Sequence, residues 1–393
     1  MKIAMVLSTF PPISGGAGSS CEIISMELIK RGHEVHIITQ KFNNEEKDFE
    51  EKTGLKIFRV KTPFSSGKTG LINFYKTAKK ISDKIKELDK NENYDIIHSH
   101  EVTIGNSAVF MYTYGKENKR RKTVLKYGGD LVYEVLGTIK PKGWLPEKGY
   151  LASWKFSHIL SRIFFILEKK MINHYALVYS NSEYGKWLLE NEMKVNKKIK
   201  IVRNPIDTQK FKPMRKFLFK DYNKIVAITI SRLVPWKGIE TAIDAVKKLN
   251  GKVYLIVIGD GVYKERLKSM ADKNIAFVNS IPHEKINDYI NSCDIYIHPS
   301  YFDPNPNSLL EAMSCGKPCI SANITTIKEF VKDNWNGLLF SAGNSDELKN
   351  KIGFLINNKK SGRLGNNAVK SILKNNSIGV VVDKIEKLYR CIK

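Results

Sequence analysis

The sequence has few cysteines and no long hydrophobic run. Its five cysteines form no Cys-x-x-Cys pair and no cluster of histidines accompanies them, which argues against a structural zinc site and predicts reduced thiols. Cys315 and Cys319 are expected to pack at a helix end rather than to act in redox chemistry. No segment reaches the roughly 18 uncharged apolar residues of a membrane-spanning helix. The short apolar run at the N-terminus is predicted to be a buried strand rather than a signal peptide, so we expect a cytoplasmic protein, with peripheral contact at the inner membrane face as an option.

Acidic residues are scarce relative to basic ones. The chain has 65 lysines and arginines against 40 aspartates and glutamates, which gives a net charge of +25 at pH 7. An excess of this size suits nucleic acid, an anionic membrane or phosphorylated ligands. The basic residues are spread over both halves of the chain, and no nucleic-acid-binding motif accompanies them. Nucleic acid is therefore not expected as a partner.

The sequence does contain a regular alternation of strands and helices. An apolar content of 42% is that of a globular protein, and 393 residues are too many for one ordinary core. Repeated strand–turn–helix units predict an α/β protein with two doubly wound parallel sheets. Strands are predicted at 3–8, 34–39, 56–60, 96–98, 123–127, 177–180, 225–231, 253–259 and 294–299, and helices at 18–31, 71–88, 151–174, 239–249, 262–273 and 377–393.

The boundary between the two halves is predicted in the segment Asn204–Pro213, which has two prolines and little periodicity. The expected domains are residues 1–204 and residues 205–376. The tail 377–393 has the pattern of an amphipathic helix. Periodicity alone leaves open whether this helix caps its own domain or packs on the other one.

Two acidic residues, Asp303 and Glu311, flank the most informative loop. The loop follows the predicted strand 294–299, and the short apolar helix that contains Glu311 ends at Gly316. Open α/β sheets bind ligands at the carboxyl ends of strands, and two carboxylates beside a helix N-terminus suit a ligand with hydroxyls and a phosphate. A glycosidase-type acid/base pair is rejected, because Glu311 lies in an apolar helix start. The structural alternative is that Glu311 only pairs with the helix dipole.

Two cations, Arg232 and Lys237, follow the predicted strand 225–231 and precede a helix. Five residues apart on a loop at a helix N-terminus, they can clamp a diphosphate between them. Solvated surface charges are the alternative. A glycine-rich turn at residues 11–18 stands in the same place after the first strand, and its glycines let the backbone approach an anion. Gly16 is the residue expected to approach most closely, although a tight turn alone would also use glycine.

These motifs resemble family 4 of the retaining glycosyltransferases with the GT-B fold. Asp303 and Glu311 match that family's E-x7-E signature with Asp in the first position, and residues 231–238 match S-R-L-x-x-x-K-G. Residues 11–18 match P-P-x-x-G-G-x-G. Weaker matches are at 204–211, 259–261 and 336–337. The resemblance covers nearly the whole chain and implies two Rossmann-like domains facing a central cleft, with the last helix crossing back to the N-terminal domain.

The resemblance implies roles for the matching residues of the second half. Arg232 and Lys237 would hold the donor diphosphate and stabilise its departure. Asp303 would contact the sugar hydroxyls, although it is one methylene shorter than the usual Glu, and Glu311 would bond the ribose. The donor-binding residues implied in this way are Gly16, Arg232, Lys237, Gly259, Asp303, Glu311, and Asn307 and Ser308 through their backbone amides.

The first half carries the implied acceptor and sugar side. Residues 95–100 resemble D-x-x-H-x-H, which places His100 at the cleft as a candidate catalytic residue; a packed, hydrogen-bonded histidine is the equal alternative. Tyr127 stands where many relatives have a histidine that touches the transferred sugar. Asp130, in a G-D-x-x-x-E segment at 129–134, would meet the acceptor or the sugar.

The activity implied by the resemblance is retaining transfer of a sugar from a nucleotide sugar, with UDP or GDP as the expected carrier, to a glycan, a lipid-linked sugar or a small molecule. No separate cofactor is expected. No divalent metal is expected either, because two cations can replace it at the diphosphate and no D-x-D motif lies near a strand end. The alternatives are a nucleotide-sugar 2-epimerase, a sugar phosphorylase, for which no lysine context for pyridoxal phosphate is evident, and a basic binding protein without catalysis.

Aromatic residues and lysines are mixed in the segment Lys140–Phe156. Such a mixture suits a bilayer interface and predicts peripheral contact with an anionic membrane. Buried aromatics beside solvated lysines are the commoner explanation.

Overall fold

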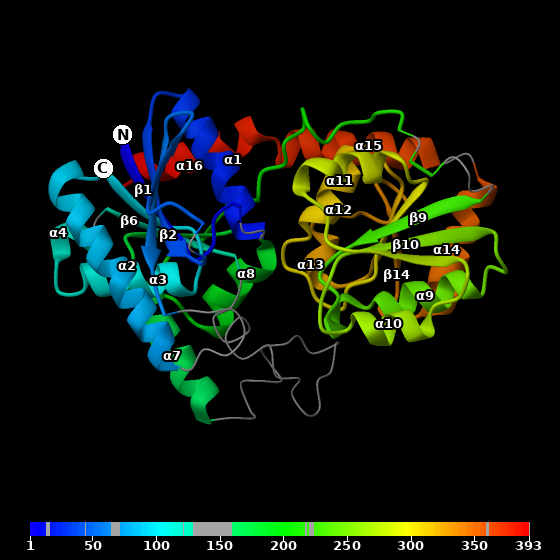
Figure 1. Ribbon diagram of the computed structural model, residues 1–393, viewed down its shortest axis with the longest axis horizontal. Coiled ribbons are helices and arrows are strands. Elements are labelled where there is room, and N and C mark those ends of the chain that lie inside the picture. The colour runs from blue at the N-terminus through cyan, green and yellow to red at the C-terminus, as the bar shows by residue number, and fades with distance from the viewer. Residues whose placement is uncertain are drawn as a thin grey trace. The chain divides into compact units, whose positions relative to one another are not determined.

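Figure 1 shows the computed structural model of the chain, which describes residues 1–12, 16–43, 45–63, 71–120, 122–128, 159–216, 218–219, 224–358 and 361–392. The chain forms two compact units. The first unit consists of Met1–Pro205 and Ile378–Lys393, and the second consists of Ile206–Ser377. Each unit is built on a parallel sheet flanked by helices, which confirms the expected fold class.

The sheet of the first unit has eight strands in the order β3-β4-β2-β1-β5-β6-β7-β8. Every neighbouring pair is parallel except β3 with β4. The chain winds outward from β1 on one side and from β5 on the other, so the winding reverses between these two strands. The strands are β1 (Lys2–Val6), β2 (Glu34–Lys41), β3 (Phe49–Lys52), β4 (Leu55–Lys61), β5 (Ile96–Ser99), β6 (Thr123–Tyr127), β7 (Leu177–Ser180) and β8 (Lys200–Ile201).

Helices cover both faces of this sheet. Their apolar residues recur every three or four positions, as in α2, where Ala78, Ile81, Ile85 and Leu88 are buried in the core. The start of α8 is fixed by Ser182, whose side chain accepts a hydrogen bond from the Gly185 amide. The helices of the unit are α1 (Gly16–Lys30), α2 (Leu71–Glu92), α3 (Ile104–Thr113), α4 (Glu117–Arg120), α7 (Ile159–His174), α8 (Glu183–Trp187), the π-helical turn η2 (Leu188–Glu192) and α16 (Ile378–Arg390).

The C-terminal helix α16 belongs to the first unit, as the family resemblance implied. It runs beside α1 (red and blue in Figure 1). Arg31 at the end of α1 donates to Asp383 at 2.7 Å and to Glu386 at 2.9 Å. The hydroxyl of Tyr389 lies 2.7 Å from Nδ1 of His98 on β5. The buried side chains of the helix are Val381, Val382, Ile385, Leu388 and Tyr389. The helix therefore completes the core of a unit from which it is distant in sequence.

The sheet of the second unit has six parallel strands in the order β11-β10-β9-β12-β13-β14. The chain leaves β9 toward β10 and β11, then returns to β12 on the other side of β9. This reversal between β9 and β12 is a topological switch point, the usual ligand position in an open α/β sheet. The strands are β9 (Ile225–Ile230), β10 (Val253–Ile258), β11 (Ile275–Val278), β12 (Ile295–His298), β13 (Cys319–Ala322) and β14 (Leu338–Phe340).

The helices of the second unit follow the strands one by one. In α9 the residues Ile239, Ala242, Ile243 and Val246 are buried at the spacing of one helix face. In α14 the side chain of Asn344 caps the first turn by accepting from the Glu347 amide at 3.0 Å. The helices are the 3-10 turn η3 (Pro235–Lys237), α9 (Ile239–Lys247), α10 (Lys264–Met270), α11 (His283–Asn291), α12 (Asn307–Ser314), α13 (Thr325–Lys328), α14 (Ser345–Asn357) and α15 (Ser361–Asn375).

Several sequence-based boundaries differ from the structure by one to four residues. The helix predicted at 262–273 extends over Lys264–Met270, because residues 262–263 form a turn before it and Ala271 after it is extended, with a ψ of 153°. The long helix predicted at 151–174 is described from Ile159 onward, and its earlier part lies outside the described residues. Within the described part of the chain, no helix combines the length and apolar character needed to cross a membrane.

Candidate functional site

Four of the residues predicted to bind a donor follow two neighbouring strands of the second unit. Arg232 and Lys237 come after β9, and Asp303 and Glu311 come after β12, which pairs with β9. Because both strands are parallel, all four residues leave the same edge of the sheet at its switch point. The structure thus brings them to one edge, as the sequence predicted, and it joins Lys237 to Asp303 directly.

Lys237 and Asp303 form a largely buried ion pair. Nζ of Lys237 lies 2.5 Å from Oδ2 of Asp303, and the two side chains are 14% and 11% exposed. Nε2 of His298, at the end of β12, lies 3.4 Å from the same oxygen. Burial would by itself raise the pKa of Asp303, but Lys237 and His298 outweigh it and hold that pKa below its usual range. Asp303 is therefore an ionised carboxylate within reach of a cation.

The loop that carries Arg232 rests on the Gly-Asp-Gly segment after β10. The Leu233 amide donates to the Asp260 carbonyl at 2.8 Å, and a side chain at Gly259 would overlap the carbonyl of Ser231. Gly259 has a φ of +144°, a conformation that favours glycine. The glycine predicted to lie near the nucleotide thus supports the Arg232 loop, while the Arg232 side chain itself is exposed.

The turn that carries Lys237 is fixed against the loop after β12. Gly238 has a φ of +63°, and a side chain there would overlap the carbonyl of Pro299. The Tyr301 amide donates to the carbonyl of Trp236 at 2.9 Å. These contacts set the position of Lys237 relative to the strand that precedes Asp303.

At the start of α12, Asn307 and Ser308 make hydrogen bonds within the protein. The amide of Asn307, predicted to reach the sugar or phosphate, donates to the Asn305 carbonyl at 2.9 Å within its own loop. The hydroxyl of Ser308 donates to the carbonyl of Ile230 at 2.9 Å. In this structure Asn307 and Ser308 therefore stabilise the loop and connect α12 to the end of β9.

Glu311 lies in the second turn of α12 and is nearly buried, at 7% exposure. Its Oε1 is 2.9 Å from Nε2 of His283, the first residue of α11. Nδ1 of His283 is in turn 3.2 Å from Nζ of Lys210. The position of Glu311 beyond the first turn and its bond to an imidazole do not support the simple pairing with the helix dipole.

At the switch point of the first unit, a carboxylate joins the ends of β1 and β5. Glu101 accepts from the backbone amide and the hydroxyl of Ser8, both at 2.7 Å, and from the Gly105 amide at 3.1 Å. Burial raises the pKa of Glu101 despite these bonds. The edge that the sequence assigns to the acceptor is thus held by a partly buried acid.

His100 is buried next to this acid, at 1% exposure, which does not suit the predicted catalytic contact with substrate. Its Nε2 lies 2.9 Å from Nζ of Lys126 and 2.9 Å from Oγ of Ser20 on α1. When Lys126 is an ammonium it can only donate, so Nε2 then accepts from it. Burial and the Lys126 charge hold the pKa of His100 well below its usual value, and burial lowers the pKa of Lys126 to about 7. The geometry fits a positioning role for His100.

The remaining predicted residues of the first unit have different outcomes. Gly16 is the exposed first residue of α1, and Tyr127 is buried at the end of β6. Asp130 and the aromatic segment 140–156 lie outside the described residues.

The five cysteines are free thiols, and burial raises the pKa of Cys315 to about 12, which agrees with packing rather than redox chemistry.

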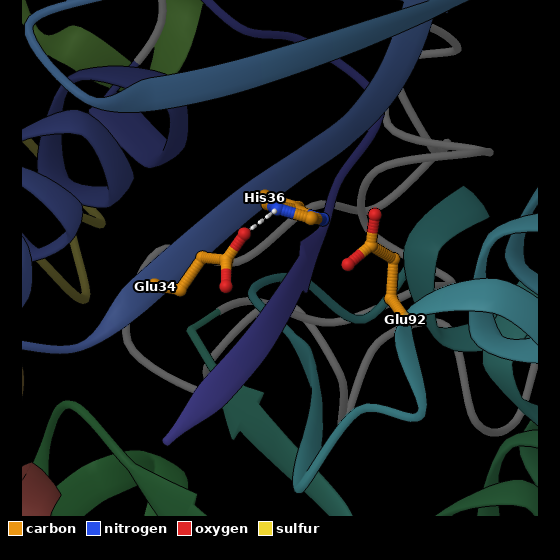
Figure 2. A group of neighbouring side chains, drawn as sticks. All are labelled: Glu34, His36 and Glu92. Carbon is orange, nitrogen blue, oxygen red and sulfur yellow. Dashed lines mark hydrogen bonds and ion pairs between the residues drawn. The ribbon is translucent and has the colours of Figure 1, made fainter.

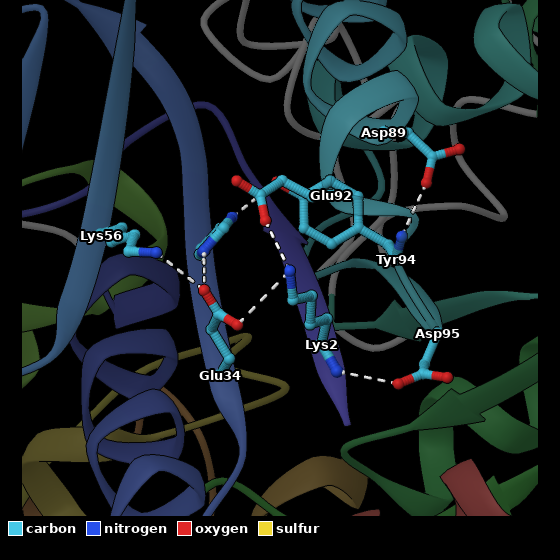
Figure 3. A network of polar contacts seen from close by, with 8 residues as sticks. Lys2, Glu34, Lys56, Asp89, Glu92, Tyr94 and Asp95 are labelled. Carbon is cyan, nitrogen blue, oxygen red and sulfur yellow. Dashed lines mark hydrogen bonds and ion pairs between the residues drawn. The ribbon is translucent and has the colours of Figure 1, made fainter.

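A group with metal-ligand types lies at the opposite edge of the first sheet. Glu34, His36 and Glu92 approach one another near the amino ends of β1 and β2 (Figure 2). Lys2 lies 2.8 Å from Glu92, and Lys56 lies 2.7 Å from Glu34, so two ammonium groups neutralise the carboxylates (Figure 3). Both ring nitrogens of His36 also have partners, the Tyr94 hydroxyl and Glu34. The group is an ion-pair network rather than a vacant ligand set.

Comparison with known proteins then decides the family. A model described as Glycosyltransferase Family 4 matches residues 14–210, half of the chain, and one described as Glycosyl transferases group 1 matches residues 210–371. The chain belongs to glycosyltransferase family 4. The resemblance inferred from its motifs is thereby confirmed.

The relatives of this family 4 chain are distant. It is 33% identical over 202 residues to an uncharacterised glycosyltransferase of Methanocaldococcus jannaschii, covering 48% of this chain and 51% of that protein. It is 27% identical over 213 residues to the Escherichia coli UDP-Gal:alpha-D-GlcNAc-diphosphoundecaprenol alpha-1,3-galactosyltransferase, covering 49% and 54%. The matches thus span about half the length of these relatives. Sucrose-phosphate synthase from Thermosynechococcus elongatus has a TM-score of 0.83 at 17% identity over 100% and 98% of the two chains, which shows the shared GT-B fold.

Several residues of this family 4 chain were missed by sequence reasoning. His298 ends a buried apolar strand and His283 opens an otherwise ordinary helix, so neither belongs to a recognisable spacing. Lys126 occupies a buried strand position, where a lysine is rare unless paired. That rarity was the one signal that could have singled it out.

Proposed function

We propose that this chain is a glycosyltransferase that moves a sugar from a nucleotide sugar to a hydroxyl acceptor with retention of anomeric configuration. The observation that carries the proposal is the Lys237–Asp303 pair at the switch point of the second sheet, with Arg232 on the same loop as Lys237 and Glu311 in the helix that follows Asp303. A cation beside a carboxylate can hold a phosphate and a sugar hydroxyl at adjacent positions. Family membership supports the same reaction class.

In the proposed reaction the bond between the anomeric carbon and the diphosphate oxygen breaks. A bond from the acceptor oxygen to the same face of that carbon forms, and the acceptor proton passes to the departing phosphate. Arg232 and Lys237 neutralise the charge that builds on the diphosphate, and preorganised donors of this kind typically contribute a few kcal/mol each. Lys237 has three N–H donors, so it can bind a phosphate oxygen while keeping its bond to Asp303. On this proposal no divalent metal is required.

The proposed donor is UDP- or GDP-linked and is held by the second unit, whereas the acceptor is taken by the first. The E. coli relative is named for a UDP-sugar and a diphosphoundecaprenol acceptor, which supports a UDP donor and a lipid-linked or glycan acceptor here. A lipid-linked acceptor would bring the protein to an anionic membrane from the cytoplasm, in keeping with its charge of +25. A small-molecule acceptor fits the same chemistry.

The test begins with thermal shifts of the purified chain in UDP-, GDP- and ADP-sugars, because a ligand that binds only the folded state raises its melting temperature. The stabilising donor is then incubated with candidate acceptors, with and without EDTA, and the anomeric configuration of the product is read by NMR. Retained configuration and insensitivity to EDTA are expected.

Two results would replace the proposal. Consumption of the donor without any acceptor would indicate an epimerase. Salt-sensitive nucleic-acid binding without any response to nucleotide sugars would indicate a basic binding protein.

A further inference from the structure

Three side chains of the second unit form a directed chain of polar contacts that ends on Glu311. Lys210 Nζ lies 3.2 Å from His283 Nδ1, and His283 Nε2 lies 2.9 Å from Glu311 Oε1. An ammonium has no acceptor, so Nδ1 must accept from Lys210. This fixes the imidazole in the tautomer with hydrogen on Nε2, and that hydrogen is donated to Glu311. The proton positions on the His283 ring thus follow from the fact that the Lys210 ammonium can only donate.

Lys210, the first of the three side chains, is held close to α12, the helix that carries Glu311. The side chain of Asp207 accepts from the amides of Gln209 and Lys210, both at 3.0 Å, which closes a turn. The next residue, Phe211, is buried, and its carbonyl accepts from the Ser314 hydroxyl of α12 at 2.5 Å. The segment that carries Lys210 is therefore fastened to Ser314 of α12, three residues from Glu311.

His283, the middle of the three side chains, also packs against the segment that carries Lys210. The ring of His283 lies 5.4 Å from the ring of Phe211 at an interplanar angle of 52°, and Lys210 Nζ lies 5.3 Å from the centroid of the Phe211 ring. His283 is thus held by a ring contact, by Lys210 and by Glu311. A side chain held on three sides is suited to set the direction of its neighbour.

We propose that His283, aligned by Lys210, is a positioning residue that orients the Glu311 carboxylate for the ribose of a nucleoside diphosphate. A carboxylate offers about four acceptor positions, and His283 uses one of them on Oε1. The others can accept from the vicinal ribose hydroxyls. The proposal rests on the proposed function, because it takes Glu311 as the ribose contact, and it adds two residues to the recognition of the nucleoside.

The diagnostic measurement compares ligands with and without a ribose. Affinities for UDP, GDP and inorganic pyrophosphate are measured by calorimetry for the wild type and for His283→Leu, His283→Gln and Lys210→Met. His283→Leu should weaken nucleoside diphosphate binding about tenfold, the effect of losing one hydrogen bond to a charged group, and leave pyrophosphate binding unchanged. His283→Gln, whose amide can still donate to Glu311, should recover most of the affinity, and Lys210→Met should show a smaller loss than His283→Leu.

A matched control exists in the first unit. His33 Nε2 lies 2.8 Å from Glu386 Oε1, a bond of the same type away from the proposed site. His33→Leu should leave both classes of ligand unaffected. In steady-state assays His283→Leu should raise the donor KM with little change in kcat, because Glu311 holds the nucleoside equally in the ground and transition states.

A double-mutant cycle separates positioning from direct contact. If His283 acts through Glu311, His283→Leu should cost little further affinity in a Glu311→Gln background. Additive losses would show that His283 touches the nucleoside itself and would overturn the proposal. Equal losses for UDP and pyrophosphate, or no loss for either, would overturn it as well. A wild type that binds neither UDP, GDP nor pyrophosphate would instead remove the proposed function, and the inference with it.

Discussion

A single ion pair, Lys237 with Asp303, joins the proposed phosphate ligand to the residue proposed to contact the sugar. Both side chains are largely buried, and the turn that carries Lys237 is fixed by contacts to the loop after β12. Breaking a buried pair by removing one partner leaves an uncompensated charge. Lys237 is therefore both a proposed ligand for phosphate and the partner that keeps Asp303 ionised.

Replacing Lys237 by alanine should lower kcat about 100- to 1,000-fold, the usual effect of deleting one preorganised donor to developing charge. Circular dichroism should show an intact fold. Lys248→Ala is a suitable control. Lys248 follows α9, the helix that Lys237 precedes, and it makes an exposed ion pair with Asp346 at 2.7 Å. Near-normal turnover of Lys237→Ala would remove this residue from the mechanism.

The buried lysine of the first unit has a consequence for stability against pH. Burial lowers the pKa of Lys126 to about 7, whereas the unfolded chain has the ordinary value of 10.5. Between these two values the unfolded state binds more protons, so this group makes the free energy of unfolding rise with pH. The destabilisation is complete below pH 7 and disappears as the pH approaches 10.5.

Lys126→Met should therefore be more stable than the wild type at pH 6, by roughly 2–4 kcal/mol, and lose this advantage toward pH 10. Lost bonds to Ser20 and His100 reduce the gain equally at all pH values and do not change its slope. Urea unfolding at intervals from pH 6 to pH 10 provides the measurement. Lys76 is exposed, so Lys76→Met should have the stability of the wild type at every pH. A stability difference between Lys126→Met and the wild type that does not change with pH would contradict the predicted effect of the lowered Lys126 pKa.

At the scale of elements, sequence patterns were informative where local chemistry decides the structure. The strands Thr123–Tyr127 and Leu177–Ser180 were predicted to the residue, because apolar runs bounded by turns have few alternatives. The edge strand β3 and the two-residue β8 were missed, since charged residues such as Glu50 and Glu51 give no apolar alternation. Each of these two strands forms by pairing with a neighbouring strand, and the local sequence does not encode that pairing.

Gly259, which follows β10, supports the loop that carries Arg232, and a substitution at Gly259 tests this support. A methyl group at Gly259 would overlap the Ser231 carbonyl, and the φ of +144° is strained for any other residue. Gly259→Ala should destabilise the protein by about 1–3 kcal/mol and weaken UDP binding, because the loop that carries Arg232 must shift.

Gly353→Ala is the matched control for that substitution. Gly353 lies within α14 with nothing within 4 Å of an added methyl group, so alanine there should stabilise the helix by about 0.5–1 kcal/mol. Urea unfolding and calorimetric affinity for UDP should show opposite stability effects for the two variants. Equal effects would mean that the close contact at Gly259 is easily relieved.

At the scale of the whole molecule, the motifs predicted which side chains come together at one sheet edge but not which side chains support them. Arg232, Lys237, Asp303 and Glu311 were found from spacing, because they follow strands that a parallel sheet must align. His283 and Lys126 were not found, since their contacts join segments 28 and 26 residues apart or more. Contacts between such distant positions depend on tertiary packing, which a local pattern does not contain.

The same tertiary packing makes the last helix part of the first unit. The five buried side chains of α16 each contribute up to about 1.5–3 kcal/mol by removing apolar surface from water, a sum comparable with the roughly 5–15 kcal/mol stability of a whole domain. All proposed donor ligands except Gly16 lie in the other unit, Ile206–Ser377.

Deleting Ile378–Lys393 should therefore unfold or strongly destabilise the first unit while the second keeps its affinity for UDP and pyrophosphate. Hydrogen-exchange mass spectrometry should show lost protection in peptides of β1, β2 and β5 and preserved protection in those of β9, β10 and β12. Alanine at Lys384 and Lys387, on the exposed side of α16, should change stability by no more than about 0.5 kcal/mol. Equal loss of protection in both units would show that they do not fold independently, and no loss in either would mean that α16 is dispensable for the core it covers.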